Sequence, residues 1–221
     1  MSISSKIELL AKELPTYVKL VAVSKFHPVE AILEAYQAGQ RIFGESRVQE
    51  LIGKQKVLPS DIEWHFIGPL QSNKVKDIVP FIHTIHSIDS LRLLEEVNKH
   101  AAKQNRIIRI LLEIHIAMEE NKHGFMPFEV KDLLNKENIH SFNNIQICGL
   151  MGMATFTDDT TQILKEFHLL SSLFKNIKSS SVFKDIDYFN ELSMGMTDDY
   201  KLAIQEGSTM VRIGSYIFGN R

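Results

Sequence analysis

The segment Lys19-Leu-Val-Ala-Val-Ser-Lys25-Phe-His-Pro28 contains the pattern that decides the fold. Its apolar run, at positions 20–23, is short and ends in a turn-like sequence, which is typical of a buried parallel strand. Pro28 then begins a helical pattern. Lys25, placed where the strand ends, has two interpretations. It is a surface lysine whose amino group reaches solvent, or a lysine held in a pocket and ready to form a Schiff base.

The pattern of an apolar run followed by a helical segment recurs along the chain. We predict strands at residues 20–23, 41–44, 63–67, 81–88, 107–116, 145–150, 187–191 and 210–213. Strict alternation predicts a parallel sheet, and eight units in about 200 residues predict one closed (β/α)8 TIM barrel. The alternative is an open doubly wound sheet. It would have a glycine-rich phosphate loop after its first strand, but residues 24–28 contain no glycine.

Further helices are predicted outside and between these units. The apolar spacing that predicts an extra N-terminal helix is that of Ile3, Ile7, Leu10 and Leu14, with Pro15 as its end. Between the last two strands we expect a helix over residues 198–206, with Thr197 as its N-cap and Gly207 at its exit. A short final turn of helix is expected at residues 214–218.

Composition limits the classes of function. The chain has 221 residues, of which 44% are hydrophobic and 24% charged, which favours one ordinary globular domain over residues 1–221. A net charge of −2 argues against nucleic-acid binding. No apolar run is long enough to cross a membrane and no secretory signal is visible, so we expect a cytoplasmic protein. The single cysteine, Cys148, lies in an apolar run and is expected to be a buried, inert thiol.

In a barrel of this class the functional residues lie at the carboxyl ends of the strands. The ends of the last two predicted strands have Ser193 and Gly195, and Gly214 and Ser215. Glycines let backbone N–H groups approach an anion, serines add hydroxyl groups, and a helix start adds unpaired N–H donors. These loops therefore predict a phosphate site, although two ordinary turns would have the same composition.

Arg212 lies in the otherwise apolar eighth strand, so it needs buried partners. It could form a structural ion pair, for example with Glu113 or Glu191, or donate to a ring nitrogen or a carboxylate of a ligand. Strands one and eight are neighbours in a closed barrel, which places Lys25, Arg212 and the phosphate loops together. Pyridoxal phosphate (PLP), a phosphorylated aldehyde with a pyridine nitrogen, would satisfy all three groups.

No metal site is expected from the sequence. His83 and His86 are three positions apart on a predicted strand and so should point to opposite faces. The chain has no HExxH motif and one cysteine. Glycine-rich nucleotide loops and the G-x-S-x-G nucleophile motif are also missing.

Several motifs carry a resemblance to a known family. They are Val21-Ala-Val-Ser-Lys25, Phe43-Gly-Glu45, Trp64-His-Phe-Ile-Gly-Pro-Leu-Gln-Ser-Asn-Lys74, Gly149-Leu-Met151, Leu192-Ser-Met-Gly-Met-Thr-Asp-Asp199 and Gly207-Ser-Thr-Met-Val-Arg-Ile-Gly-Ser-Tyr-Ile-Phe-Gly219. Over about residues 18–221 the chain resembles the pyridoxal phosphate homeostasis protein family. The resemblance implies a barrel similar to the N-terminal domain of alanine racemase, a fold type III PLP-binding protein. In one departure, Ser46 stands where the family usually has asparagine.

The resemblance also implies roles for individual residues. Lys25 matches the lysine that holds PLP as a Schiff base, and Arg212 matches the arginine that faces the pyridine nitrogen. Ser193, Gly214 and Ser215 match the phosphate site, with Gly195 beside it. An arginine at that nitrogen keeps it unprotonated, which weakens the ring as an electron sink. The chain ends at Arg221 directly after the barrel, so we expect it to lack the second domain of alanine racemase, which supplies an acid/base tyrosine.

Three functions are compatible with the sequence. The first is a non-catalytic PLP carrier or regulator that affects amino-acid and keto-acid balance, acts as a monomer and has PLP-dependent apoenzymes as candidate recipients. The second is a PLP-dependent racemase-like enzyme, for which acid/base groups would come from His65, His86 or His115, or from a dimer partner. The third is a phosphosugar aldolase with a Schiff-base lysine, which would be colourless.

Overall fold

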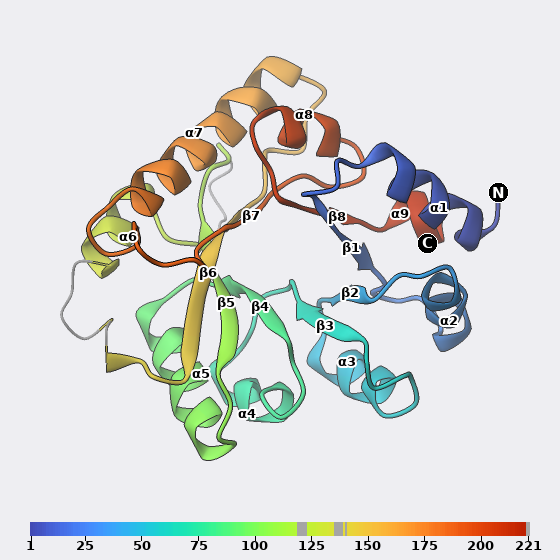
Figure 1. Ribbon diagram of the computed structural model, residues 1–221, viewed down its shortest axis with the longest axis horizontal. Coiled ribbons are helices and arrows are strands. Elements are labelled where there is room, and N and C mark those ends of the chain that lie inside the picture. The colour runs from blue at the N-terminus through green and yellow to red at the C-terminus, as the bar shows by residue number, and fades with distance from the viewer. Residues whose placement is uncertain (119–122, 135–138, 140, 220–221) are drawn as a thin grey trace.

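The first strand, β1 (Lys19–Val23), is buried along its second half, as expected for a strand inside an α/β fold. It pairs in parallel with β2 on one side and with β8 on the other. In the computed structural model, which describes residues 1–118, 123–134, 139 and 141–219, all eight strands close into a barrel (Figure 1). The (β/α)8 TIM barrel predicted from the sequence is therefore confirmed.

The remaining strands follow in chain order around the barrel. They are β2 (Ile42–Glu45), β3 (Glu63–Phe66), β4 (Thr84–Ile88), β5 (Ile108–Ile114), β6 (Ile145–Gly152), β7 (Glu191–Ser193) and β8 (Met210–Ile213). Each is hydrogen-bonded to its sequence neighbours in parallel register. All carboxyl ends therefore lie at one mouth of the barrel, and the amino ends lie at the other.

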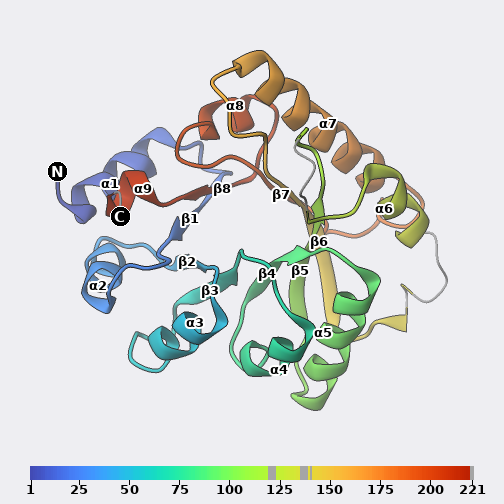
Figure 2. The same ribbon diagram turned by 180° about the vertical axis from the view of Figure 1, so that it is seen from behind.

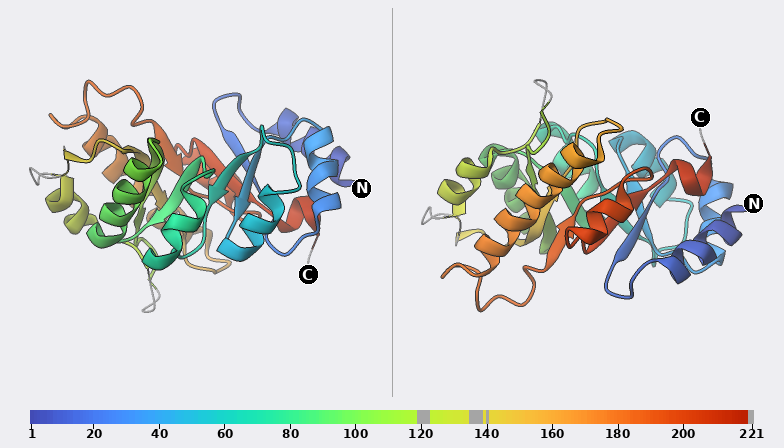
Figure 3. Two further views of the ribbon diagram at one scale, coloured as in Figure 1. Left: turned by 90° about the horizontal axis from the view of Figure 1, so that it is seen from below. Right: turned by 90° about the horizontal axis from the view of Figure 1, so that it is seen from above.

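The helices lie around the outside of the strands in views from both sides (Figures 1 and 2). They are α1 (Ile3–Glu13), α2 (Val29–Gln37), α3 (Val48–Gln55), α4 (Val75–Ile78), α5 (Leu91–Lys103), α6 (Pro127–Leu134), α7 (Thr160–Lys178), α8 (Tyr200–Gln205) and α9 (Ser215–Phe218), with a 3₁₀ turn η1 (Ser72–Lys74) before α4. The extra helix α1 lies beside α9, where Lys6 Nζ donates to the carbonyl of Ile217 at 3.2 Å. Helices α7 and α8 pack side by side (Figure 3). None of the helices in the described part of the chain is both long and apolar enough to span a membrane.

The seventh strand was placed wrongly by the sequence pattern. Residues 187–190 lie outside any strand, and β7 begins at Glu191. The aromatic side chain that suggested a strand, Phe189, instead packs on Phe183 and Phe174, with ring centroids 4.4 and 5.1 Å away. Ser193 consequently lies in the strand and is fully buried, and is not part of the loop that follows.

The helix before β8 also differs from its prediction. It begins at Tyr200, its N-cap is Asp199, and Thr197 does not cap it. The Asp199 carboxylate accepts from the backbone N–H of Met196 three residues earlier, which fixes the preceding turn. The Thr197 hydroxyl instead contacts Gly214 and Ser215, in the loop after β8.

Gly149 marks the closest backbone approach in the barrel. A Cβ atom at this position would lie 1.7 Å from the carbonyl oxygen of Glu191 on β7. The pairing of β5 with β6 shifts register next to it, between Ile110 and Leu111. Only glycine therefore allows β6 and β7 to pair here.

We predict that Gly149→Ala lowers the free energy of unfolding by about 3 kcal/mol or more, because the obstructing atom is backbone and cannot turn away. Gly53→Ala is the control. It lies inside α3 with no atom within 4 Å of the added methyl group, so we expect it to stabilise the protein by about 0.5–1 kcal/mol. Urea unfolding of the two variants measures both values. Equal stability of the variants would contradict the close approach.

Candidate cofactor-binding site

The pairing of β1 with β8 brings together the ends of the two strands that the sequence singled out. Ala22 lies opposite Ile213, so the residues after Val23 and after Ile213 leave the barrel side by side. A Cβ atom on Gly214 would lie only 3.1 Å from the carbonyl oxygen of Val23. The turn that contains Lys25 is therefore next to the loop of Gly214 and Ser215.

Lys25 lies in a tight turn closed by a hydrogen bond from His27 N–H to the Ser24 carbonyl at 3.1 Å. Phe26, its third residue, has φ +67°, a conformation that turns usually give to glycine or asparagine. Contacts with Glu50 and Arg47 help to hold it there. Its N–H donates to Glu50, and the Arg47 guanidinium lies 4.4 Å from the centre of its ring. Strain in a bulky residue persists where the surroundings over-determine it, and such positions cluster at functional sites.

A buried lysine that the sequence analysis missed anchors this turn. Lys54 on α3 donates to the Ser24 carbonyl at 2.8 Å, to Glu45 at 2.7 Å and to Glu50 at 2.6 Å. Ser24 Oγ also donates to Glu45, at 2.6 Å. Burial raises the pKa of Glu45, although Lys54 and Ser24 both favour its ionised form. The signal for Lys54 is its place three residues after the buried Leu51, on the inner face of α3.

Thr197 joins the two loops that were predicted to bind phosphate. Its hydroxyl accepts from the N–H of Gly214 at 3.4 Å and lies 3.1 Å from Ser215 Oγ. Among the described residues, the backbone N–H groups of Ser215 and Tyr216, at the start of α9, have no hydrogen-bond acceptor. Two amides and two hydroxyls thus gather at this point.

Gly195 lets α8 approach the loop after β7. Its φ is +93°, and a Cβ atom here would lie 2.6 Å from Ala203 Cβ and 2.9 Å from Tyr200 Cα. Its carbonyl accepts from Arg212 N–H at 3.0 Å, which ties the loop to β8. Gly195 therefore shapes the loop through close packing.

Arg212 is buried inside the barrel, and its partners show whether it forms the ion pair with Glu113 or Glu191 that the sequence left open. Its Nη1 donates to the Ser193 carbonyl at 2.9 Å and to Ser193 Oγ at 2.7 Å, and its Nη2 donates to the Gly152 carbonyl at 3.0 Å. The ion pair with Glu191 that we had considered does not form, because Glu191 pairs with Lys19 and Arg109 at the other mouth. Glu113 forms no ion pair with Arg212 either. Burial lowers the pKa of Arg212 to about 10, and the charges of Asp199 and Glu113 partly oppose this.

Two of the proposed histidine acid/base groups lie in the barrel interior. His86 Nδ1 is 3.2 Å from Ser193 Oγ, and its Nε2 is 2.9 Å from His65 Nδ1. Burial lowers the pKa of both histidines well below the usual value. His65 lies within β3, one residue before the strand ends at Phe66, and points its ring toward His86 inside the barrel.

Glu113, on β5, was considered from the sequence only as an ion-pair partner of Arg212, yet it is a buried titratable group in its own right. It is 6% exposed, and burial first and Asp89 second raise its pKa to about 7, while His123 and Arg212 lower it. A carboxyl group with this pKa can exchange a proton near neutral pH. Cys148, by contrast, is buried with a pKa raised to about 11 by burial, as expected for an inert thiol.

We predict that removing the buried Lys54 greatly lowers the free energy of unfolding. Lys54→Met would leave the Glu45 carboxylate buried without its cation, and we expect a loss of about 3–5 kcal/mol in unfolding free energy. Lys99→Met is the matched control, because Lys99 pairs with Glu96 on the exposed face of α5 and should cost less than about 1 kcal/mol. Adding Glu45→Gln to Lys54→Met should recover part of the loss in thermal or urea unfolding. Similar losses in the two lysine variants would contradict this role.

Comparison with known proteins assigns the fold and the family. Residues 2–221 match the family model described as alanine racemase, N-terminal domain. The chain is 42% identical to the pyridoxal phosphate homeostasis protein of Pasteurella multocida over 216 residues, which cover 96% of this chain and 90% of the relative. It is 38% identical to the protein of the same name from Schizosaccharomyces pombe, with 92% and 84% covered.

Solved structures agree. PipY of Synechococcus elongatus without PLP superposes with a TM-score of 0.90 at 36% identity, and the match covers 99% of this chain and all of PipY. PipY with PLP bound gives a TM-score of 0.84 at 35% identity over the same coverage. Alanine racemase of Clostridium difficile shares the fold, with a TM-score of 0.78 at 14% identity, and the match spans all of this chain and 56% of that enzyme. The chain therefore belongs to the pyridoxal phosphate homeostasis protein family, which is built on the alanine racemase N-terminal domain.

Proposed function

We propose that residues 1–221 form one PLP-binding barrel that holds PLP as a Schiff base on Lys25 and takes part in intracellular PLP homeostasis. In this role the protein keeps and releases the cofactor, with apoenzymes as recipients and an effect on amino-acid and keto-acid balance, and catalyses no reaction of its own. The relatives' shared name and the PLP bound in PipY support this proposal. The observation that carries it is that the β1–β8 pairing brings the end of β1, two residues before Lys25, against Gly214.

The residues present fit the cofactor at three points. The amine of Lys25 can condense with an aldehyde and release water. The free N–H groups of Ser215 and Tyr216 and the hydroxyls of Thr197 and Ser215 suit a phosphate group. Within the described ranges, Arg212 Nε–H has no hydrogen-bond acceptor, so it remains available to a ring nitrogen.

When bound, PLP supplies an aldehyde that binds amines and a ring that withdraws electrons. In our proposal the chain's own residues divide the work of holding it. Lys54 and Glu45 fix the turn that carries Lys25, while Gly195, Gly214 and Ser215 shape the phosphate loops. Ser193 orients Arg212 by accepting two hydrogen bonds from its Nη1. An arginine facing the ring nitrogen favours storage, because a cation there opposes protonation of the nitrogen.

The visible spectrum tests this function. The wild-type protein mixed with PLP should turn yellow, and borohydride should remove the band. Lys25→Ala should show no such band, because it lacks the amine. Lys56→Ala is the control. It removes an exposed lysine at the end of α3 and should keep the colour. A colourless wild type, or a yellow Lys25→Ala variant, would contradict the proposal.

Racemase-like activity is the second candidate, and the pKa of Glu113 near 7 favours it. The non-catalytic function predicts that the PLP-loaded protein exchanges the α-proton of L-alanine with deuterium no faster than free PLP does. A racemase-like site would exchange it faster. If Glu113 were the base, the rate would rise as the pH passes about 7, where that carboxyl loses its proton, and would fall in Glu113→Gln. Proton NMR in heavy water measures the exchange.

A further inference from the structure

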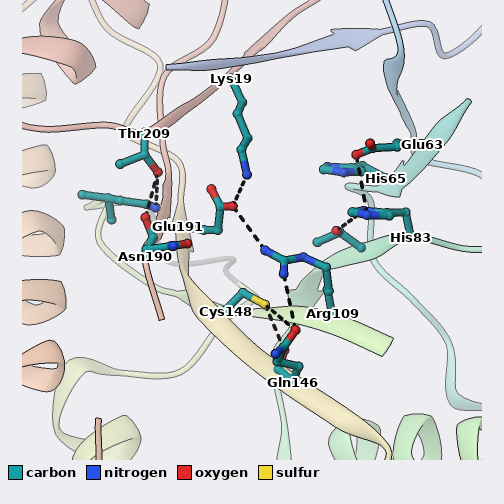
Figure 4. Close-up of polar contacts among 12 residues, drawn as sticks. Lys19, Glu63, His65, His83, Arg109, Gln146, Cys148, Asn190, Glu191 and Thr209 are labelled. Carbon is teal, nitrogen blue, oxygen red and sulfur yellow. Dashed lines mark hydrogen bonds and ion pairs between the residues drawn. The ribbon is translucent and has the colours of Figure 1, made fainter. Parts of the chain in front are cut away.

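A second cluster of chemically active side chains lies at the opposite mouth of the barrel, where the strands begin. Glu63 is the first residue of β3, His65 follows two positions later, and His83 immediately precedes β4. One oxygen or nitrogen of each side chain lies within 4.8 Å of the others (Figure 4). Glu63 Oε2 and His83 Nε2 are 3.6 Å apart. From the sequence we expected no metal site, because His83 and His86 should point to opposite faces, but the structure places His83 beside His65 of the neighbouring strand.

His65 gives an independent reason to expect a ligand. Its side chain is 2% exposed, and its Nε2 has no hydrogen-bond partner in the described part of the chain. The other ring nitrogen, Nδ1, is held 2.9 Å from His86 Nε2, which fixes the ring and leaves Nε2 as the nitrogen open to a ligand. The rings of His65 and His83 are parallel within 1°, with centroids 5.4 Å apart. Buried polar atoms without partners are rare in native proteins, so this nitrogen calls for an occupant.

We propose that Glu63, His65 and His83 bind a divalent transition metal ion of the zinc class at the amino-terminal mouth of the barrel. Two imidazole nitrogens and one carboxylate are a donor set that zinc accepts, with an open fourth position. Ligand atoms on one tetrahedral zinc ion are about 3.3 Å apart, from bond lengths of about 2.0–2.1 Å. The observed 3.6 Å between Glu63 and His83 needs only a small adjustment, whereas the half-exposed His83 ring, which lies parallel to the His65 ring, must turn to point its Nε2 lone pair at the same ion. The side chains of Glu63 and His83 are 45% and 40% exposed, so an ion and a completing water can enter from solvent.

The surroundings orient the ligands. His83 Nδ1 is 2.9 Å from Thr84 Oγ1, and when it donates there, Nε2 keeps a lone pair for the ion. The two ring nitrogens of His65 must likewise take different roles, one binding the metal and the other carrying the proton. A metal on Nε2 places the proton on Nδ1, from where it is donated to His86 Nε2. His86 Nδ1 then donates to Ser193 Oγ, 3.2 Å away.

Two cations lie near this cluster. Lys19 and Arg109 both pair with Glu191, which offsets part of their charge (Figure 4). The Glu63 carboxylate supplies the negative charge of the site itself. In the proposed site this charge favours the bound cation, so a substitution that keeps the shape of Glu63 but removes its charge should weaken binding.

Titration of the full-length protein with zinc tests the proposal. The protein is made without a histidine tag, treated with a chelator and titrated with zinc chloride in a calorimeter. We expect one ion per chain, and binding roughly tenfold weaker or more in His83→Ala, which removes a ligand, and in Glu63→Gln, which removes the charge of one. Cobalt added in place of zinc should give the absorption of a tetrahedral site in the wild type but not in His83→Ala or Glu63→Gln.

The control is His168→Ala on α7. His168 is an exposed histidine with a carboxylate, Glu206, at 3.0 Å, but it has no third ligand within the described ranges. Its removal should leave zinc binding unchanged, as should Lys25→Ala, so the result is independent of the proposed PLP function. No binding by the wild type, or equal binding by the wild type, His83→Ala and Glu63→Gln, would overturn the proposal.

Discussion

The parallel pairing of β1 with β8 closes the barrel, and the candidate site depends on it. The two strands come from the first and last tenth of the chain, and their register places Val23 against Gly214. Closure brings the turn after β1, which contains Lys25, next to the loop after β8, which contains Gly214 and Ser215. It also positions α1 against α9, so the terminal helices support the same end of the sheet. A shift of this register would separate Lys25 from the groups predicted to surround it.

The interior of the barrel contains buried polar side chains, and their hydrogen bonds link neighbouring strands as well as strands that are not neighbours. Arg212 of β8 reaches Ser193 of β7 and Gly152 of β6, and His86 of β4 reaches Ser193 from the other side. Such a network fixes side-chain positions because each buried group left without its partner would cost free energy. The same chain continues to His65 and ends at a nitrogen without a partner. The two mouths of the barrel are thus connected by hydrogen-bonding side chains.

The sequence predicted the barrel because the alternation of apolar runs and helical segments is a local pattern that can be recognised in the sequence alone. It misplaced β7 because Glu191-Leu-Ser193 has one apolar residue in three, whereas Phe189 gave a stronger signal from a packing role under α7. Lys25 and Arg212 were visible as charged residues in or beside apolar strands. Lys54 was not, because a lysine in an amphipathic helix is ordinarily at the surface. The cluster of His65 and His83 depends on cross-strand contacts, which no spacing along one strand can reveal.

The central claim is that Lys25, held on a strained turn beside the α9 loop, is the residue that carries the cofactor. The most direct measurement is the position of the covalent bond. The protein loaded with PLP is reduced with borohydride and digested, and its peptides are sequenced by mass spectrometry. We predict a single reduced adduct on Lys25. An adduct on another lysine, or one scattered over several surface lysines with Lys25 unmodified, would contradict it.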